Sequence, residues 1–407
     1  MKRSIVPLGV AILLCQAPAS DAAGPFELVD GDRVVLIGGT MIERDQSTGY
    51  LETRLTRRYP GRSITFRNLG WSGDTVEGPS RARFGTTAEG FQHLKEHVLA
   101  LRPTVVILGY GANEAFDGPA GLPRFRQGLD TLLKTIEPTG ARLIFLAPNR
   151  QEDLGPPLPD PARHNADLAL YRDALREAAE KRGAAFVDLF DLLPDGAKAT
   201  PRLPLTDKGI HFNPYGYWRE AAAIEQALIP GPRAPVADDP APSRIRFATD
   251  ASELTPIPGG IRFRFRDEML PAPPPPDGGP GLPGDGREVA ISGLKPGRYV
   301  LKFEGRPIGT ADADDWAGGV EIRQGPEFDQ AEALRRAINA KNELYFYRWR
   351  PQNETYLFGF RKHEQGQNAR EIPQFDPLVA AKEAEIARLR VPVAHTYELT
   401  REGEVGR

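Results

Sequence analysis

The stretch Val34-Val35-Leu36-Ile37-Gly38-Gly39-Thr40 decides the fold that this chain is expected to adopt. Its four leading apolar residues, three of them β-branched, run without alternation, which favours a strand buried on both faces. The two glycines that follow allow a tight turn that a Cβ would obstruct. Thr40 therefore stands at the carboxyl end of a strand, the edge of an open parallel sheet at which ligands bind. Taken alone, the glycine pair is also explained by a plain turn from a strand into a helix.

Segments with strand and helix patterns alternate five times between residue 31 and about residue 228. Short apolar runs favour strands, and apolar residues at helical spacing lie between them. Such alternation predicts an α/β fold with helices on both faces of a parallel sheet. The strands are expected over residues 34–37, 64–68, 105–108, 143–147 and 186–189, with a closing helix over 215–228.

The chain of 407 residues is longer than one typical domain, and its composition marks a boundary. A segment rich in Pro, Ala and Asp predicts a linker over 231–244, after a folded domain over 24–230. The rest, 245–407, is predicted to be an α+β region whose Pro- and Gly-rich segment 271–287 forms a mobile loop. Within this region we expect helices over 327–341 and 378–389.

Residues 1–23 have the order of a secretory signal peptide. Lys2-Arg3 precede a short apolar core, and small residues follow up to a predicted cleavage site near Ala22 or Ala23. The only cysteine, Cys15, lies in this segment, so the exported chain would offer no thiol for catalysis or for a metal site. We expect a periplasmic or extracellular protein with no stable membrane insertion, because no later segment is long and apolar enough to cross a membrane.

The net charge of -3 argues against binding to nucleic acid.

Polar blocks follow the predicted strands at the point where each strand ends. Thr40 follows the first strand, and the blocks 68–75, 109–114 and 206–213 follow the second, third and fifth. The carboxyl ends of parallel strands meet at one edge of a sheet, so these blocks are expected to converge. A hydroxyl, a histidine and N–H donors are the parts that acyl transfer needs. Taken singly, each residue also has a plain structural explanation, but four such explanations would have to hold together.

The four blocks resemble those of the SGNH (GDSL-type) hydrolases over about residues 31–228. The resemblance implies a flavodoxin-like, three-layer α/β fold around a five-stranded parallel sheet. Thr40 takes the place of the nucleophilic serine, and His211 matches the family's base. Gly73 and Asn113 match the residues that supply oxyanion-hole donors, together with the backbone N–H of residue 40.

Two departures from the family pattern concern the chemistry directly. The first block has Gly39-Thr40 where the family has Asp-Ser, and the threonine methyl group restricts χ1 and crowds the attack. Three residues before His211 stands Lys208 in place of the family's aspartate, with Asp207 one position further back. Loss of the carboxylate that orients the imidazole can cost about four orders of magnitude in a serine protease. Asp207 fills this role if the loop shifts by one residue, and a backbone carbonyl is the alternative.

We therefore predict an exported hydrolase that cleaves an ester of a small molecule or deacetylates a polysaccharide. Thr40 is the expected nucleophile, His211 the base and Asp207 a weaker candidate for the orienting carboxylate. No cofactor and no metal are expected. The alternative is a catalytically impaired protein of the same fold that binds a carbohydrate or acyl ligand. The acyl group, the alcohol and the oligomeric state stay open.

The segment 341–374 is dense in aromatic and arginine side chains. Such a composition suits a carbohydrate-binding surface. It is equally suited to packing against the first domain, and the sequence leaves both interpretations open.

Overall fold

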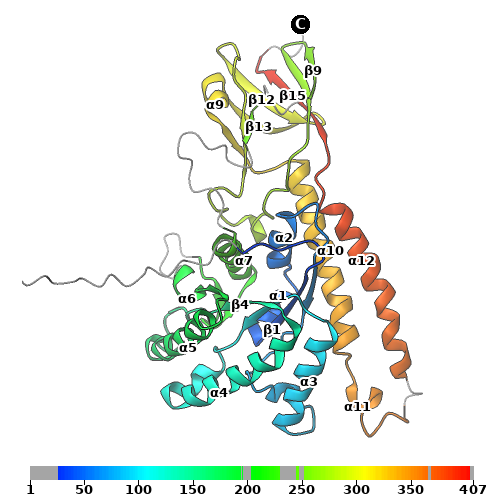
Figure 1. The fold of residues 1–407 in the computed structure, drawn as a ribbon. Coiled ribbons are helices and arrows are strands. Elements are labelled where there is room, and N and C mark those ends of the chain that lie inside the picture. The colour runs from blue at the N-terminus through cyan, green and yellow to red at the C-terminus, as the bar shows by residue number, and fades with distance from the viewer. Residues whose placement is uncertain are drawn as a thin grey trace, which may run out of the picture.

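The computed structural model describes residues 26–193, 195, 203–229, 244–246, 252–364 and 368–403. The predicted signal peptide and nearly all of the predicted linker lie outside these residues. We call residues 26–229 the α/β part and residues 244–403 the C-terminal part. Figure 1 shows antiparallel strands of the C-terminal part at one end of the molecule and the α/β part at the other. No helix in the described ranges is long and apolar enough to cross a membrane.

The centre of the α/β part is a five-stranded sheet in the order β2-β1-β3-β4-β5, with every neighbouring pair parallel. This is the flavodoxin-like order, so the predicted fold class is confirmed. The uninterrupted apolar runs of β1 and β3 are buried, as expected for strands covered on both faces. The strands are β1 (Arg33–Gly38), β2 (Thr65–Asn68), β3 (Val105–Gly109), β4 (Arg142–Leu146) and β5 (Ala185–Val187).

Helices cover both faces of this sheet. Alternate residues of β1 belong to different cores: Val34 and Leu36 pack with α1, α2 and α7, whereas Val35 and Ile37 pack with α3, α4 and α5. Because β1 is an interior strand, paired with β2 on one side and β3 on the other, its end is enclosed from both sides. The helices are α1 (Thr40–Asp45), α2 (Tyr50–Arg57), α3 (Thr87–Ala100), α4 (Gly118–Ile136), α5 (Ala162–Glu180), α6 (Leu189–Leu192) and α7 (Pro214–Leu228).

The C-terminal part contains two sheets with a core of their own. One sheet has the order β13-β12-β15-β10-β9 and the other the order β14-β11-β8. Phe263, Leu301 and Trp316 are buried in the core that these sheets share. The strands are β8 (Arg244–Arg246), β9 (Ser252–Ile257), β10 (Gly260–Phe265), β11 (Arg287–Ala290), β12 (Arg298–Phe303), β13 (Arg306–Asp312), β14 (Val320–Ile322) and β15 (His395–Arg401). The helices are α9 (Ala313–Gly318), α10 (Pro326–Trp349), α11 (Glu354–Leu357) and α12 (Phe375–Leu389).

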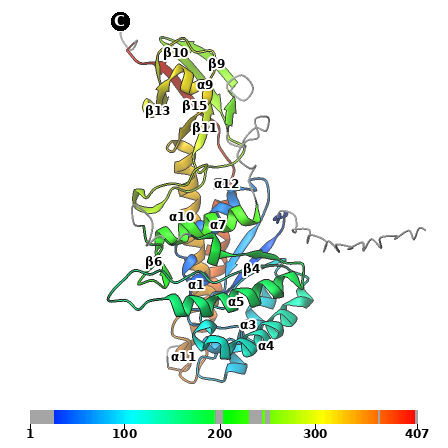
Figure 2. The same ribbon diagram turned by 90° about the vertical axis from the view of Figure 1, so that its left-hand side faces the viewer.

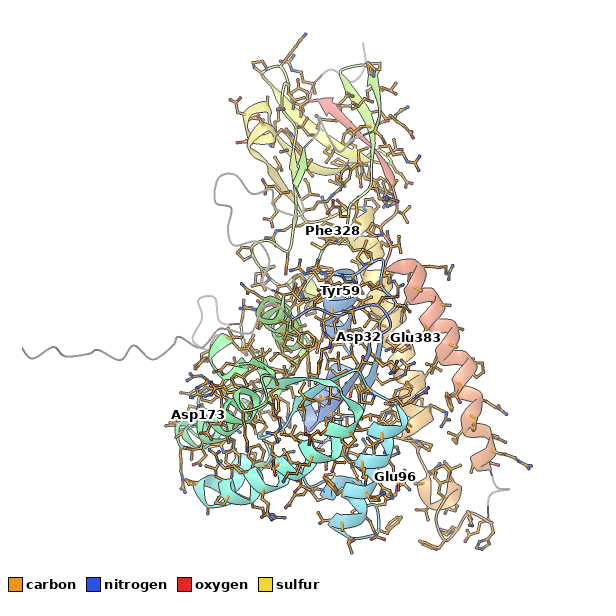
Figure 3. The ribbon with its side chains drawn as sticks, viewed as in Figure 1. Asp32, Tyr59, Glu96, Asp173, Phe328 and Glu383 are labelled. Carbon is orange, nitrogen blue, oxygen red and sulfur yellow. The ribbon has the colours of Figure 1, made fainter. Side chains whose placement is uncertain are left out.

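Helix α10 joins the two parts of the molecule. It begins near Phe328 below the antiparallel strands and runs along the α/β part, with α12 beside it (Figures 1, 2 and 3). Glu383 on α12, also labelled in Figure 3, pairs with Arg67 on β2. Tyr345 and Trp349 of the aromatic segment pack against the core of the α/β part, whereas Phe360 is exposed. The packing interpretation therefore holds for the part of this segment that lies in α10, residues 341–349.

The Pro- and Gly-rich segment 271–287 contacts the α/β part at separate points. The Trp218 indole N–H donates to the carbonyl of Pro273 at 2.9 Å. Asp285 pairs with the buried guanidinium of Arg54 at 2.8 Å. The residues of the α/β part that make these contacts lie on α2 and α7. The mobility of the loop stays a prediction.

A buried ion pair ties α10 to α2, and its removal should destabilise the protein strongly. Lys341 Nζ is fully buried and donates to both carboxylate oxygens of Glu52 at 2.8 Å and to the carbonyl of Phe66 at 3.0 Å. Lys341→Met leaves the Glu52 carboxylate buried without its cation, which typically costs about 3–5 kcal/mol. We expect that loss in the free energy of unfolding, measured by urea denaturation. The double variant Glu52→Gln, Lys341→Met should recover part of it, and an unchanged midpoint in the single variant would contradict the assignment.

Candidate active site

A cavity of about 210 Å³ opens at the carboxyl ends of the sheet strands and brings together three of the predicted site residues. Thr40, Asn113 and His211 all line it, although they come from separate segments of the chain. Gly73 is not one of the lining residues, but its backbone N–H donates to Thr40 Oγ1, with the nitrogen 3.4 Å from that oxygen. The convergence expected at the strand ends is therefore what the structure shows.

The two glycines before Thr40 are explained by close approach of neighbouring groups. A Cβ at Gly38 would lie 2.4 Å from the carbonyl oxygen of Gly109 at the end of β3. A Cβ at Gly39 would lie 3.1 Å from the amide nitrogen of Asn113. An aspartate in place of Gly39 would thus require that amide to shift by a few tenths of an ångström. Thr40 itself begins α1, where the first N–H groups have no partner inside the helix.

The loop after β2 places Gly73 beside Thr40. The φ angle of Gly73 is +76°, a conformation that favours glycine. Glu43 on α1 fixes the preceding residue, because its carboxylate accepts the Ser72 backbone N–H at 2.6 Å and the Ser72 hydroxyl at 3.0 Å. Glu43 is a residue that the sequence analysis missed.

The Asn113 side chain is held by the same loop. Its Nδ2 donates to the carbonyl of Asp74 at 2.7 Å. An amide nitrogen carries two hydrogens, so a second one is available to a ligand. The Asp74 carboxylate is buried with Arg81, at 2.6 Å. Burial raises the pKa of Asp74, and the Arg81 cation acts in the opposite direction.

Glu114 ties the two donor loops together. It is buried, and it accepts the N–H of Val76 at 3.0 Å and that of Gly111 at 2.9 Å. Burial raises the pKa of Glu114 to about 7, although these N–H groups lower it. The sequence placed Glu114 in a site block without assigning it this role.

His211 stands on a short hairpin formed by β6 (Thr206–Asp207) and β7 (His211–Phe212). Lys208 and Gly209 in its turn have φ angles of +55° and +82°, as in hairpin turns of the primed type. The Gly209 carbonyl accepts the N–H of Glu152 at 2.9 Å. Lys208 is exposed at the turn.

Asp207 lies directly opposite His211 in the hairpin ladder. The Cβ atoms of such pairs are about 4.5–5.5 Å apart. Asp207 is nevertheless exposed, and within the described residues no hydrogen bond or ion pair joins its carboxylate to the imidazole. Burial lowers the pKa of His211, the Arg44 charge lowers it further, and the Asp207 charge opposes both.

Glu152 anchors this hairpin and was not recognised from the sequence. Its buried carboxylate accepts the backbone N–H groups of Leu205 at 3.0 Å and of Thr206 at 2.8 Å, and the Thr206 hydroxyl. It lies far along the chain from the hairpin, so no local pattern could have indicated the contact.

The role of Asn213, in contrast, can be recognised from neighbouring residues. Asn213 precedes Pro214 and caps α7 by accepting the N–H of Gly216.

An aromatic pair lies at the rim of the cavity. Phe116 is 64% exposed, and its ring stacks on that of His164 with centroids 4.2 Å apart. Both residues line the cavity. Sequence reasoning identified neither of them. Within the described ranges, no group of three or more His, Cys, Asp and Glu side chains could hold a metal ion.

Residues 36–219 match the model of the GDSL-like lipase/acylhydrolase family. Among curated proteins, nothing matches the chain. A solved structure titled BT4096, a gut microbial diltiazem-metabolizing enzyme, has a TM-score of 0.70 at 16% identity, over 92% of this chain and 99% of that one. A catalytic mutant of Axe2, an acetylxylan esterase from Geobacillus stearothermophilus, has a TM-score of 0.40 at 19% identity, over 49% and 95%. The likeness to BT4096 shows that the fold of both parts, and not only of the α/β part, occurs in another protein.

Proposed function

We propose that this chain, whose residues 36–219 match the model of the GDSL-like lipase/acylhydrolase family, hydrolyses carboxylic esters. One observation supports this most strongly. One small cavity at the carboxyl edge of the sheet is lined by Thr40, which carries a hydroxyl, by His211, which carries an imidazole, and by Asn113, which carries an amide donor. These are the groups that nucleophilic acyl transfer needs.

The proposed reaction has two halves. In the first, Thr40 Oγ1 attacks the ester carbonyl carbon while His211 takes the hydroxyl proton. The N–H groups of Thr40, Gly73 and Asn113 stabilise the oxyanion. The alcohol then leaves with the proton from His211, and an acyl-threonine ester remains. In the second half, water gives a proton to His211 and its oxygen attacks the acyl carbon. His211 then returns the proton to Thr40 Oγ1 as the bond to the acyl group breaks and the acid is released.

The cavity favours a small, uncharged acyl group. Its volume of about 210 Å³ is modest, and its lining combines apolar side chains such as Met41 and Leu168 with the neutral amides of Asn149 and Gln151. The exposed ring of Phe116 at the rim suits the flat face of a sugar or of another ring in the alcohol. We therefore propose acetyl esters, including those of carbohydrates, as the substrates.

The second candidate function is ligand binding without turnover. It is favoured by the exposed position of Asp207, whose carboxylate makes no hydrogen bond or ion pair with the His211 imidazole in the described part of the chain. The crowding methyl group of the Thr40 nucleophile points in the same direction. The same cavity would then hold a carbohydrate or acyl ligand.

Hydrolysis of p-nitrophenyl acetate and of an acetylated xylo-oligosaccharide separates the two candidates. Turnover by the purified protein above that of a Thr40→Ala blank supports the esterase. Equal rates for the two proteins, with calorimetric binding of the oligosaccharide, support the binding protein. We further propose export of the protein, on the order of residues 1–23.

Asn113→Ala should lower kcat for p-nitrophenyl acetate by roughly 10²–10³-fold, the usual cost of removing one oxyanion donor. KM should change little, because the donor acts mainly on charge that develops in the transition state. Steady-state kinetics measures both constants. Asn113→Asp keeps the shape of the side chain and removes the N–H donors, so it should lose as much as alanine. A higher KM at unchanged kcat would place Asn113 in substrate binding instead.

A further inference from the structure

The carboxyl end of α10 lies against the loop that follows β2. Trp349 is only 8% exposed and shares a core with residues of the central sheet. Its ring meets that of Trp71 edge-on, with centroids 5.8 Å apart, and that of His97 at 5.3 Å. The C-terminal part therefore reaches the α/β part right beside the loop that carries Gly73.

Arg350, the next residue, contacts two groups of the α/β part at once. Its guanidinium carbon lies 3.6 Å from the centroid of the Trp71 ring, as in a cation–π contact. Its Nη1 donates to Glu43 Oε2 at 2.7 Å. The side chains of this ion pair are 24% and 19% exposed, so the pair is less weakened by solvent than a surface pair.

Glu43 binds the loop with both carboxylate oxygens. Oε2, the atom that Arg350 contacts, also accepts the Ser72 backbone N–H, and Oε1 accepts the Ser72 hydroxyl. The next N–H along the chain is that of Gly73, which points to Thr40 Oγ1. The loop packs directly on α1, since a Cβ at Gly70 would lie 2.3 Å from the backbone nitrogen of Glu43. The position of the Gly73 N–H thus depends on the orientation of the Glu43 carboxylate.

We propose that Arg350 is a positioning residue: it orients Glu43, and Glu43 holds the Gly73 N–H where the oxyanion forms. This inference rests on the proposed function, in which Gly73 supplies an oxyanion donor. Donors stabilise a transition state only when they are in place before the charge develops, and a displacement of about 1 Å can cost about 10²-fold in rate. The C-terminal part then completes the active site of the α/β part.

Arg348 on α10, two residues before Arg350, supplies a matched control. Its Nε donates to Asp376 at 2.7 Å, and the two side chains are 35% and 58% exposed. Arg348→Ala therefore removes a guanidinium and an ion pair from α10 without removing a contact to Glu43 or to the loop.

Hydrogen–deuterium exchange tests the positioning step independently of any activity. In the full chain, Arg350→Gln should speed deuterium uptake in peptides that span residues 70–76 and leave peptides that span 105–109 unchanged. Arg348→Ala should leave both unchanged. Equal uptake in Arg350→Gln and wild type overturns the inference, whether or not the protein hydrolyses esters. If uptake rises as expected but wild type hydrolyses no ester, the proposed function fails and the positioning of the loop stands.

Kinetics then tests the consequence for catalysis. Arg350→Gln should lower kcat for p-nitrophenyl acetate roughly 10–100-fold at unchanged KM, less than the loss of a donor itself. Arg350→Lys should recover part of the rate, because an ammonium pairs with Glu43 but lacks the guanidinium plane that stacks on Trp71. If Arg350 acts through Glu43, the double variant Glu43→Gln, Arg350→Gln should be no slower than Glu43→Gln alone. Additive losses, or a change in KM alone, overturn the proposed route through Glu43.

Discussion

His211→Ala is expected to abolish nearly all ester hydrolysis, with a fall in kcat of roughly 10⁴-fold. His211 is the histidine on the β6–β7 hairpin, and it shares the cavity with Thr40. Its loss removes the base that takes the hydroxyl proton and the acid that returns it to the leaving alcohol. Steady-state hydrolysis of p-nitrophenyl acetate measures the effect, and circular dichroism checks that the variant is folded.

The pH profile gives the same prediction a second readout. Burial and the Arg44 charge lower the pKa of His211 from its usual value, which is about 6.5. The base must be neutral to act, so kcat/KM should stay high as the pH falls to about 6.5 and decline only below it. Arg44→Gln removes a cation that disfavours imidazolium, so the decline should move to higher pH. An acid limb centred above pH 7 in the wild type would contradict the assignment.

Thr40→Ala is the companion control, because nucleophile and base act as a unit. The fall in kcat in Thr40→Ala should be about as large as that in His211→Ala. The double variant Thr40→Ala, His211→Ala should have a kcat only slightly lower than either single variant. Thr40→Ser should retain or raise the rate, since serine lacks the crowding methyl group. Full activity in Thr40→Ala would exclude Thr40 as nucleophile and would direct attention to Ser72 or to a water molecule activated by His211.

The sheet could be predicted because each of its strands carries its own signal. The apolar run 34–37 became β1, and the predicted closing helix 215–228 became α7 (Pro214–Leu228). The fifth strand was predicted to extend to residue 189, but Leu189 begins α6. There the Asp188 side chain accepts the N–H of Asp191 and caps the helix, a local signal that the apolar pattern hid.

The contacts between distant segments could not be predicted, because their determinants do not lie near one another in the sequence. The helix predicted over 327–341 continues to Trp349, whose burial depends on Trp71 and His97. Glu43 and Glu152 support the site through backbone N–H groups, and nothing local distinguishes such carboxylates from exposed ones. The domain boundaries and the roles of the site residues stay predictions.

Lys208→Asp is expected to raise kcat for p-nitrophenyl acetate, because it places a carboxylate three residues before His211, at the spacing of the SGNH hydrolases. The roughly 10⁴-fold cost of losing that group in a serine protease sets the upper limit of the gain. The backbone should accept the change, since Lys208 has a φ angle of +55° and aspartate tolerates this conformation better than lysine does. Position 208 is exposed, so the substitution disturbs no buried contact.

Lys208→Asn is the control that separates the two effects of this substitution. It removes the cation, has the size of aspartate and tolerates the same φ angle, but it adds no charge. If the missing carboxylate limits the rate, kcat of Lys208→Asp should exceed that of both Lys208→Asn and wild type, and Asp207→Asn should change kcat little.

If Asp207 moves to the imidazole when substrate binds, Asp207→Asn should instead lower kcat, and Lys208→Asp should not raise it. Equal rates in Lys208→Asp and Lys208→Asn would show that a carboxylate at position 208 does not reach the imidazole. A gain from an inactive wild type would identify the ligand-binding alternative as a hydrolase that lost its orienting group.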